Sequence, residues 1–305
     1  MTPTVLAAYV AMVLLWGSTW AAIAVGVASV PPFVFALERA VAVAVLLTLL
    51  SLTLHLPFPR DGRTIAAAAT AGLFNIGIPW AVIFWSEQFV PSGLVAVFGA
   101  TFPIWTAILA HYLVRGDRLS RLKVGALALG LLGTAILAGA PIEGGGPNVL
   151  LATALLSVVP ILWGMGAILA ARYLSGSSPV PVVAIEVWAS VVILTPFALS
   201  ETSRPAVWTP AVIGAFLFLV VGGSCVGLVL NLWLYRKLRP TTVSLSQVLF
   251  AVQALLLGAV ALGEQVTARM AVGALLVFAA VGLNARAGSG PPQRSDKAGA
   301  VAAAD

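Results

Sequence analysis

The chain has 305 residues, of which 61% are hydrophobic and 9% are charged, and its mean hydropathy is +1.07. Water-soluble domains carry about a quarter charged residues, so this composition excludes a soluble globular protein. The chain has one cysteine, which excludes an internal disulfide, and with only two histidines a zinc enzyme is not expected.

The apolar residues fall in continuous runs, several of them close to the ~20 residues that cross a bilayer as a helix. Strands of a membrane β-barrel would alternate instead. Turn residues such as Pro31-Pro32 and Pro91 separate the runs. The sequence therefore predicts an all-α integral membrane fold with ten transmembrane helices, at about residues 5–25, 33–54, 65–87, 93–113, 123–140, 148–170, 181–200, 209–234, 242–262 and 270–286.

The two ends of the chain differ from the runs between them. No basic residue precedes the first apolar run, and no clean cleavage site follows it, so we expect a retained helix rather than a signal peptide. Residues 288–305 are rich in Gly, Pro, Ala, Ser and charge, and we expect them to form a disordered cytoplasmic tail.

The basic residues predict the orientation, because cytoplasmic loops are enriched in Lys and Arg. With the N-terminus in the cytoplasm, the inside loops and the tail hold 13 of the 16 Lys and Arg residues. The outside loops hold Arg204 and Arg269, and Arg39 lies within a helix. We therefore expect a multi-pass protein of the inner (plasma) membrane with both termini cytoplasmic, and the net charge of +6 does not indicate nucleic-acid binding.

The chain repeats itself. Leu15-Trp16-Gly17 returns as Leu162-Trp163-Gly164, Glu38 corresponds to Glu186, and Pro91 corresponds to Pro240, at shifts of 147, 148 and 149 residues. A nearly constant shift is the mark of a duplication. The sequence predicts a first five-helix repeat at 1–143 and a second at 144–287.

Five helices is an odd number, so the second repeat enters the membrane from the opposite side. The loop charges agree with this inversion. Residues 86–91 contain no basic residue, whereas their counterpart, residues 235–240, contains three. Inverted repeats are the architecture of many secondary transporters, which hold the solute near the midplane between the repeats.

These motifs resemble a known family. The Leu-Trp-Gly-Ser-Thr-Trp segment at 15–20, the Glu38-Arg39 pair, the junction at Pro91 and the helix ends at 116–119 and 263–266 are similar to the EamA repeats of the drug/metabolite transporter superfamily. The resemblance implies transport of small metabolites, often amino-acid export across bacterial inner membranes. Val252 stands where the family usually has a proline, so a symmetric pair of proline kinks is not expected.

Ionisable side chains inside a span are costly and indicate function. Arg39 would hold a substrate carboxylate or a structural partner, and Glu38 or Glu186 would attract an amino group or bind a coupling proton. Snorkelling of all three to the membrane surface is the alternative, because they lie only ~10 Å from a helix end.

Uncharged polar and aromatic residues complete the candidates for substrate binding or gating. Each buried polar group needs a hydrogen-bond partner or water, so binding and helix–helix contact both stay open. Trp80 and Trp105 lie beside prolines, where a kink would open a cavity, and Trp163 is expected near a helix end. The complete set is Glu38, Arg39, Asn75, Trp80, Thr101, Trp105, Trp163, Glu186, Gln247 and Gln253.

The sequence contains no Walker motif, nucleophile elbow or metal-ligand cluster, so no catalytic residue, metal or cofactor is expected. The leading hypothesis is a secondary exporter of small organic metabolites such as amino acids, working by alternating access, with protons as a coupling ion or by facilitated diffusion. A multidrug or lipophilic-cation exporter of the same fold is the main alternative, and a membrane-embedded lipid enzyme is the weakest. A monomer suffices, because both repeats are in one chain.

Overall fold

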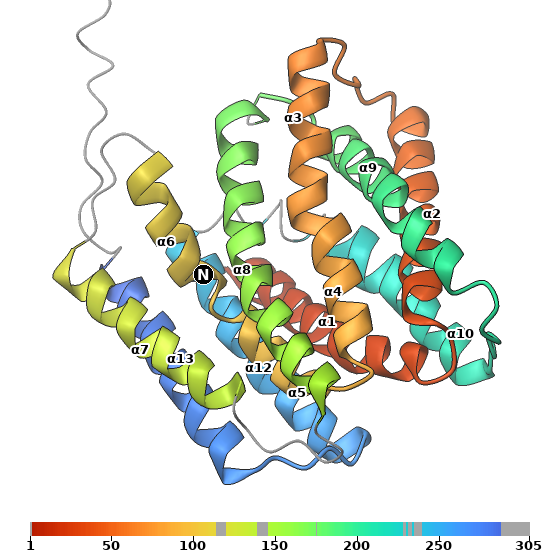
Figure 1. The fold of residues 1–305 in the computed structure, drawn as a ribbon. Helices are drawn as coiled ribbons and strands as arrows, with labels where there is room; N and C mark the ends of the chain where they lie inside the picture. The colour runs from red at the N-terminus through yellow and green to blue at the C-terminus, as the bar shows by residue number, and fades with distance from the viewer. Residues whose placement is uncertain are drawn as a thin grey trace, which may run out of the picture.

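The computed structural model describes residues 2–113, 120–138, 146–174, 176–227, 230, 234 and 240–287. These residues form helices and no strand. In chain order the elements are α1 (Pro3–Val27), α2 (Pro32–Thr53), α3 (Gly62–Gly72), η1 (Leu73–Gly77), α4 (Ile78–Ser86), α5 (Ser92–Gly99), α6 (Phe102–Leu113), α7 (Arg121–Ala138), α8 (Pro147–Tyr173), α9 (Pro179–Ser200), α10 (Pro210–Leu217), η2 (Phe218–Val226), α12 (Pro240–Ala261) and α13 (Ala268–Ala287) (Figure 1).

Every range predicted to be a helix contains helical residues, and seven helices of the described part are long and apolar enough to cross a membrane. The fourth predicted helix is interrupted at Ala100 and Thr101, just before Pro103, whereas α12 runs unbroken past Val252. The helix of the first repeat is therefore broken next to its proline, whereas the helix of the second repeat, which has Val252 at this position, is continuous. Arg115, Arg118, Arg236, Lys237, Arg239 and the tail from Gly288 lie outside the described residues.

The helix starts follow from local chemistry. Proline occupies the first turn of α1, α2, α8, α9 and α10, where no backbone N–H is required. Thr2, Asp61 and Thr209 accept hydrogen bonds from N–H groups of the turns that follow them. The carboxylate of Asp61 is stabilised by the Thr64 N–H, which lowers the pKa of Asp61.

Two helix N-termini are capped by acids from far along the chain. The backbone N–H of Phe33 in α2 donates to Glu201, at the end of α9. The N–H groups of Ser92 and Gly93 in α5 donate to Glu264, which follows α12. A carboxylate at a helix N-terminus satisfies free N–H groups and the helix dipole, so these contacts join the two halves of the chain.

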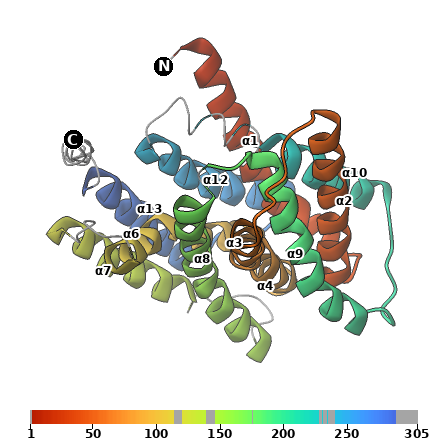
Figure 2. The same ribbon diagram turned by 90° about the horizontal axis from the view of Figure 1, so that it is seen from above.

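Two helix pairs place the halves side by side. α2 lies along α9, and α7 lies along α13 as a separate pair in both views (Figures 1 and 2). Between α7 and α13, Gly133 and Gly273 bring the two backbones into direct contact. A Cβ on Gly133 would lie 2.9 Å from the Gly273 oxygen, so glycine is required for this packing.

Candidate functional site

The Trp16-Gly17-Ser18 segment of α1 binds the second half of the chain. The indole N–H of Trp16 donates to the Gly223 carbonyl oxygen at 2.8 Å. The side chain of Gln253 lies against Gly17, where an added Cβ would meet it at 2.7 Å, and donates to Ser18 Oγ at 2.9 Å. The motif is therefore a docking segment, and its glycine makes room for the glutamine.

The Trp163-Gly164 segment of α8 makes the corresponding contacts with the first half. The Trp163 indole N–H donates to the Asn75 carbonyl oxygen at 3.0 Å. A Cβ on Gly164 would lie 3.4 Å from the backbone of Thr106 in α6. Thr106 and Gln253 are 147 residues apart, the same shift that relates Gly17 to Gly164. Trp163 lies well inside α8, so its expected position near a helix end was wrong.

Both acceptor carbonyls belong to π-helical segments at matching places, η1 and η2. In η1 the Asn75 carbonyl has no partner four residues on, because residue 79 is a proline without an N–H. In η2 the N–H of Gly227 bonds the carbonyls of Gly222 and Ser224, and the Trp16 indole donates to the Gly223 carbonyl between them. A buried carbonyl needs a partner, and in each case a tryptophan from the other half supplies it.

Arg39 lies buried against η2. Its side chain is 5% exposed, and its Cζ stands 4.1 Å from the centre of the Trp80 ring. Nη2 donates to Ser224 Oγ at 3.1 Å, while Nε has no partner in the described part of the chain. The cation is held by an aromatic face and one hydroxyl, without an ion pair within 4 Å among the described residues.

Glu186 lies buried against η1, the π segment of the first half. It is 7% exposed, and its carboxyl interacts with the Asn75 side chain. Gly72 permits the close approach, because a Cβ there would collide with the Glu186 backbone. The two inward-facing charges of the halves thus have opposite signs and each contacts the π segment of the opposite half.

Arg39 and Glu186 lie at different depths. The Phe33–Glu201 bond and a 3.1 Å bond from Trp188 Nε1 to Thr48 Oγ1 place α2 and α9 antiparallel and in register. Glu186 is therefore level with about residue 49 of α2, ten residues from Arg39. At 1.5 Å per residue the two levels are ~15 Å apart, so one small amino acid does not contact both residues in this conformation.

The remaining predicted residues are more dispersed. Glu38 is half-buried, as are Trp105 on α6 and Gln247 on α12. Thr101 is buried and its hydroxyl donates to the Phe98 carbonyl at the interruption between α5 and α6. Gln253 faces α1, so its role in this conformation is helix–helix contact.

A narrow apolar gap lies where the halves meet. Trp20, Ile83, Phe98, Gly99 and Trp163 line it together with Val95, Leu156 and Val159. The empty volume between these side chains is about 150 Å³, and it is too narrow to hold a water molecule. Gly99 makes room for both tryptophans, because a Cβ there would lie 3.2 Å from Trp163 and 3.7 Å from Trp20.

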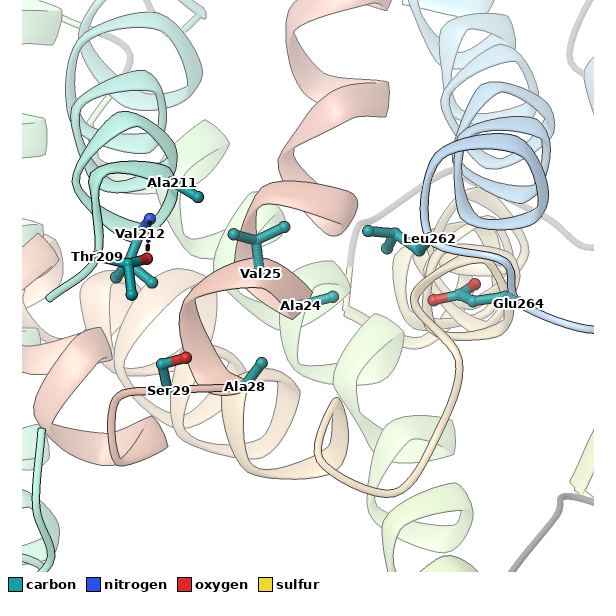
Figure 3. A pocket seen from close by; sticks show the side chains of 9 residues that line it. All are labelled: Ala24, Val25, Ala28, Ser29, Thr209, Ala211, Val212, Leu262 and Glu264. Atoms are coloured by element: carbon teal, nitrogen blue, oxygen red, sulfur yellow. Dashed lines mark hydrogen bonds between the residues drawn. The ribbon is translucent and has the colours of Figure 1, made fainter. Parts of the chain in front are cut away.

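A second, open pocket of about 420 Å³ lies between the end of α1, the start of α10 and the segment after α12 (Figure 3). Small and apolar side chains form most of it. Glu264 is the ionisable residue in its lining, and Figure 3 shows its carboxylate on the side of α12. This pocket gives solvent a path to the carboxylate that caps α5.

One family profile matches the chain twice, once in each half. The profile of the EamA-like transporter family matches residues 3–139 and again residues 150–286. The chain belongs to this family. The interlocked Trp-Gly segments come one from each matched range.

Curated relatives are named as transporters. The chain is 24% identical to the uncharacterized transporter YoaV of Bacillus subtilis over 280 residues, covering 90% of this chain and 94% of YoaV. It is 29% identical to the uncharacterized inner membrane transporter YedA of Escherichia coli K12, covering 89% and 87%. A solved crystal structure shares the fold at a TM-score of 0.62 and 18% identity, with 93% and 96% covered. This EamA protein is accordingly a multi-pass membrane transporter and not an enzyme.

Three acids of the structural site were missing from the sequence-based set. Glu87, Glu201 and Glu264 stand just after helices, where a hydropathy profile suggests solvated loop residues. Glu87 and Glu201 are nevertheless buried, at 9% and 6% exposure. Glu264 could have been found from the sequence, because it is the glutamate of the Gly263-Glu264 helix end that carries the family resemblance.

Proposed function

We propose that this EamA protein is a secondary transporter that works by alternating access between two inverted five-helix repeats, residues 1–143 and 144–287. The observation that carries the proposal is the reciprocal pair of contacts, Trp16 with Gly223 and Trp163 with Asn75. Each repeat supplies a donor to the other, so exchanging the conformations of the repeats preserves both contacts while reversing the open side. The double match of one family profile supports the same division.

The transporter lies in the inner membrane with both termini in the cytoplasm, and ten helices cross the bilayer. Support for this orientation comes from the distribution of Lys and Arg between the loops. The name of the relative YedA supports the inner membrane as the location. Residues 288–305 form the cytoplasmic tail.

The substrates are small organic metabolites, with amino acids as the leading class and export as the direction. Arg39 supports a substrate with a carboxylate, because it is a buried cation whose described neighbours do not neutralise it. Glu186, ~15 Å away along the helices, serves the amino group at another stage of the cycle rather than together with Arg39. Export rests on the family resemblance.

Counterflow in proteoliposomes tests this function. Vesicles are loaded with a panel of unlabelled amino acids, and uptake of labelled threonine, methionine and phenylalanine is measured. Trans-stimulated uptake that Arg39→Gln abolishes supports the amino-acid site. Absence of uptake for all three substrates, with folded protein in the vesicles, contradicts the amino-acid proposal.

A multidrug or lipophilic-cation exporter is the second candidate, and the aromatic lining of the narrow gap favours it. The gap is lined by Trp20, Phe98 and Trp163, and aromatic faces attract lipophilic cations. Such an exporter would keep its activity in Arg39→Gln. It would lose its activity when a candidate glutamate, Glu38 or Glu186, is replaced by glutamine. Efflux of a fluorescent lipophilic cation from these variants separates the candidates.

A further inference from the structure

Glu87 is a buried carboxyl without a hydrogen-bond partner. It follows the last residue of the Gly62–Ser86 span and is 9% exposed. Both of its carboxyl oxygens are buried and neither has a partner in the described part of the chain, and the same is true of the neighbouring Ser86 and Ser92 hydroxyls. An ionised carboxylate in such surroundings is costly, so the site favours the protonated acid.

The charged groups around Glu87 oppose one another. Burial raises the pKa of Glu87 well above its ordinary value, the Glu264 carboxylate raises it further, and Arg39 lowers it. Neighbouring α5 contains no ionisable residue. The acids of α9 are engaged elsewhere, Glu186 with Asn75 and Glu201 with Phe33 and Arg204. Burial therefore favours the protonated form of Glu87, and Arg39 and Glu264 are the charged groups that act on it with opposite signs.

Glu87 and Arg39 face the same stripe of α4. Arg39 stacks over Trp80 at 4.1 Å and stands 5.8 Å from the Phe84 ring. Glu87 lies three residues beyond Phe84, which on a helix is the next turn of the same face. Arg39 thus has two polar positions available: its present one on Ser224, and one nearer Glu87.

One residue near Glu87, Glu264, also lines the open pocket. Glu264 lines the pocket in Figure 3 and also caps α5 through Ser92 and Gly93. Its Oε2 is held close to Gly258, and Ser92 Oγ lies on the same side. Glu264 therefore stands between solvent and the buried Glu87.

We propose that Glu87 is the proton-binding group of this transporter and that its charge decides the position of Arg39. When protonated, Glu87 leaves Arg39 on Ser224 of η2, as seen here. When its proton leaves through the pocket, the carboxylate attracts Arg39 along the Trp80–Phe84 face, and the contact with η2 is lost. Only a proton is exchanged with water. The coupling to transport rests on the proposed function, whereas the proton binding does not.

The proton binding is tested without a substrate. Trp80 fluorescence, isolated by subtracting the Trp80→Phe variant, is titrated with pH in purified full-length protein. We expect one transition, with a midpoint well above that of an ordinary glutamate, which is lost in Glu87→Gln and kept in Glu38→Gln. Infrared difference spectra should show the carboxylic acid band disappearing over the same pH range.

Two results would overturn the proposal: a folded Glu87→Gln protein with the wild-type transition, or a wild type with no transition. Should Glu87→Gln not fold, Glu87→Asp serves instead, and an unchanged midpoint in that variant contradicts the assignment. For coupling, counterflow of any transported solute should depend on external pH in the wild type and not in Glu87→Gln. Failure to find a solute would concern the proposed function alone, because the fluorescence transition is measured without one.

Discussion

The indole N–H of Trp163 donates to the backbone carbonyl of Asn75 across 3.0 Å, from one half of the chain to the other. Its counterpart, from Trp16 to Gly223, is 2.8 Å long and joins the same two halves in the reverse sense. Both bonds end on backbone carbonyls of the π segments η1 and η2. The pair is therefore part of the backbone hydrogen bonding of the fold, although it is made by side chains.

Removing either indole should destabilise the protein. Trp16→Phe and Trp163→Phe each remove the indole donor to a part-buried carbonyl, and loss of such a bond costs about 1–3 kcal/mol. Trp188→Phe is the matched control, because Trp188 is 42% exposed and its bond goes to a hydroxyl. Thermal unfolding in detergent should show lower Tm values for the first two variants, and equal losses in all three would contradict this role.

The α7–α13 contact depends on glycine. In Gly133→Ala the new methyl would overlap the Gly273 oxygen and the Val277 backbone, neither of which can rotate away. We expect a loss of about 1–3 kcal/mol from overpacking. Gly282→Ala on the same helix pair has open space and should cost nothing. Denaturant titrations of the two variants, read by circular dichroism, make the comparison.

The Glu201 side chain should matter more than its ion-pair partner. Glu201→Ala removes the acceptor for the Phe33 N–H at the start of α2, and loss of such a cap costs about 0.5–2 kcal/mol. Arg204→Ala removes an ion pair whose arginine is 53% exposed, so a change of at most about 0.5 kcal/mol is expected. Tm values in low and high salt test this, and a larger effect of Arg204→Ala would refute the capping role.

The stability of the protein should fall as the pH rises. Because folding raises the pKa of Glu87, the acid contributes stability that is complete below the pKa of the unfolded chain, about 4.3. That contribution is lost as the pH passes through the raised value of the folded state. Tm measured against pH should show this decline in the wild type, and Glu87→Gln should flatten it. An increase of Tm over the same range would have the wrong sign.

The proposed orientation predicts which loops reagents reach. In a Cys225→Ser background, Thr202→Cys follows α9 on the outside and Gly62→Cys begins α3 on the inside, and both positions are exposed. A membrane-impermeant maleimide added to intact cells should label position 202, and position 62 only after permeabilisation. The reverse pattern would invert the topology.

The sequence was informative where chemistry is local and less so where it depends on partners. Long apolar runs and prolines located the helices, and the cost of a buried charge identified Arg39 and Glu186 correctly as buried. The π segments were not predicted, because one additional residue in a helical turn leaves hydropathy unchanged. Glu87 was missed because its burial comes from tertiary packing, which hydropathy along the chain does not show.

The interlocking of α1 with η2 and α12 has a consequence for how the chain is made. Trp16 and Gly223 are 207 residues apart, and Gln253 reaches back 239 residues to Leu14. During synthesis α1 is inserted first but waits for its docking partners until almost the whole chain has left the ribosome. Contacts of such high order slow folding, and the uncovered face of α1 is exposed to lipid and to insertion factors meanwhile. A chain that stops before Gln253 lacks the contacts of this glutamine with Leu14 and Ser18, so we expect premature termination to leave α1 incompletely packed.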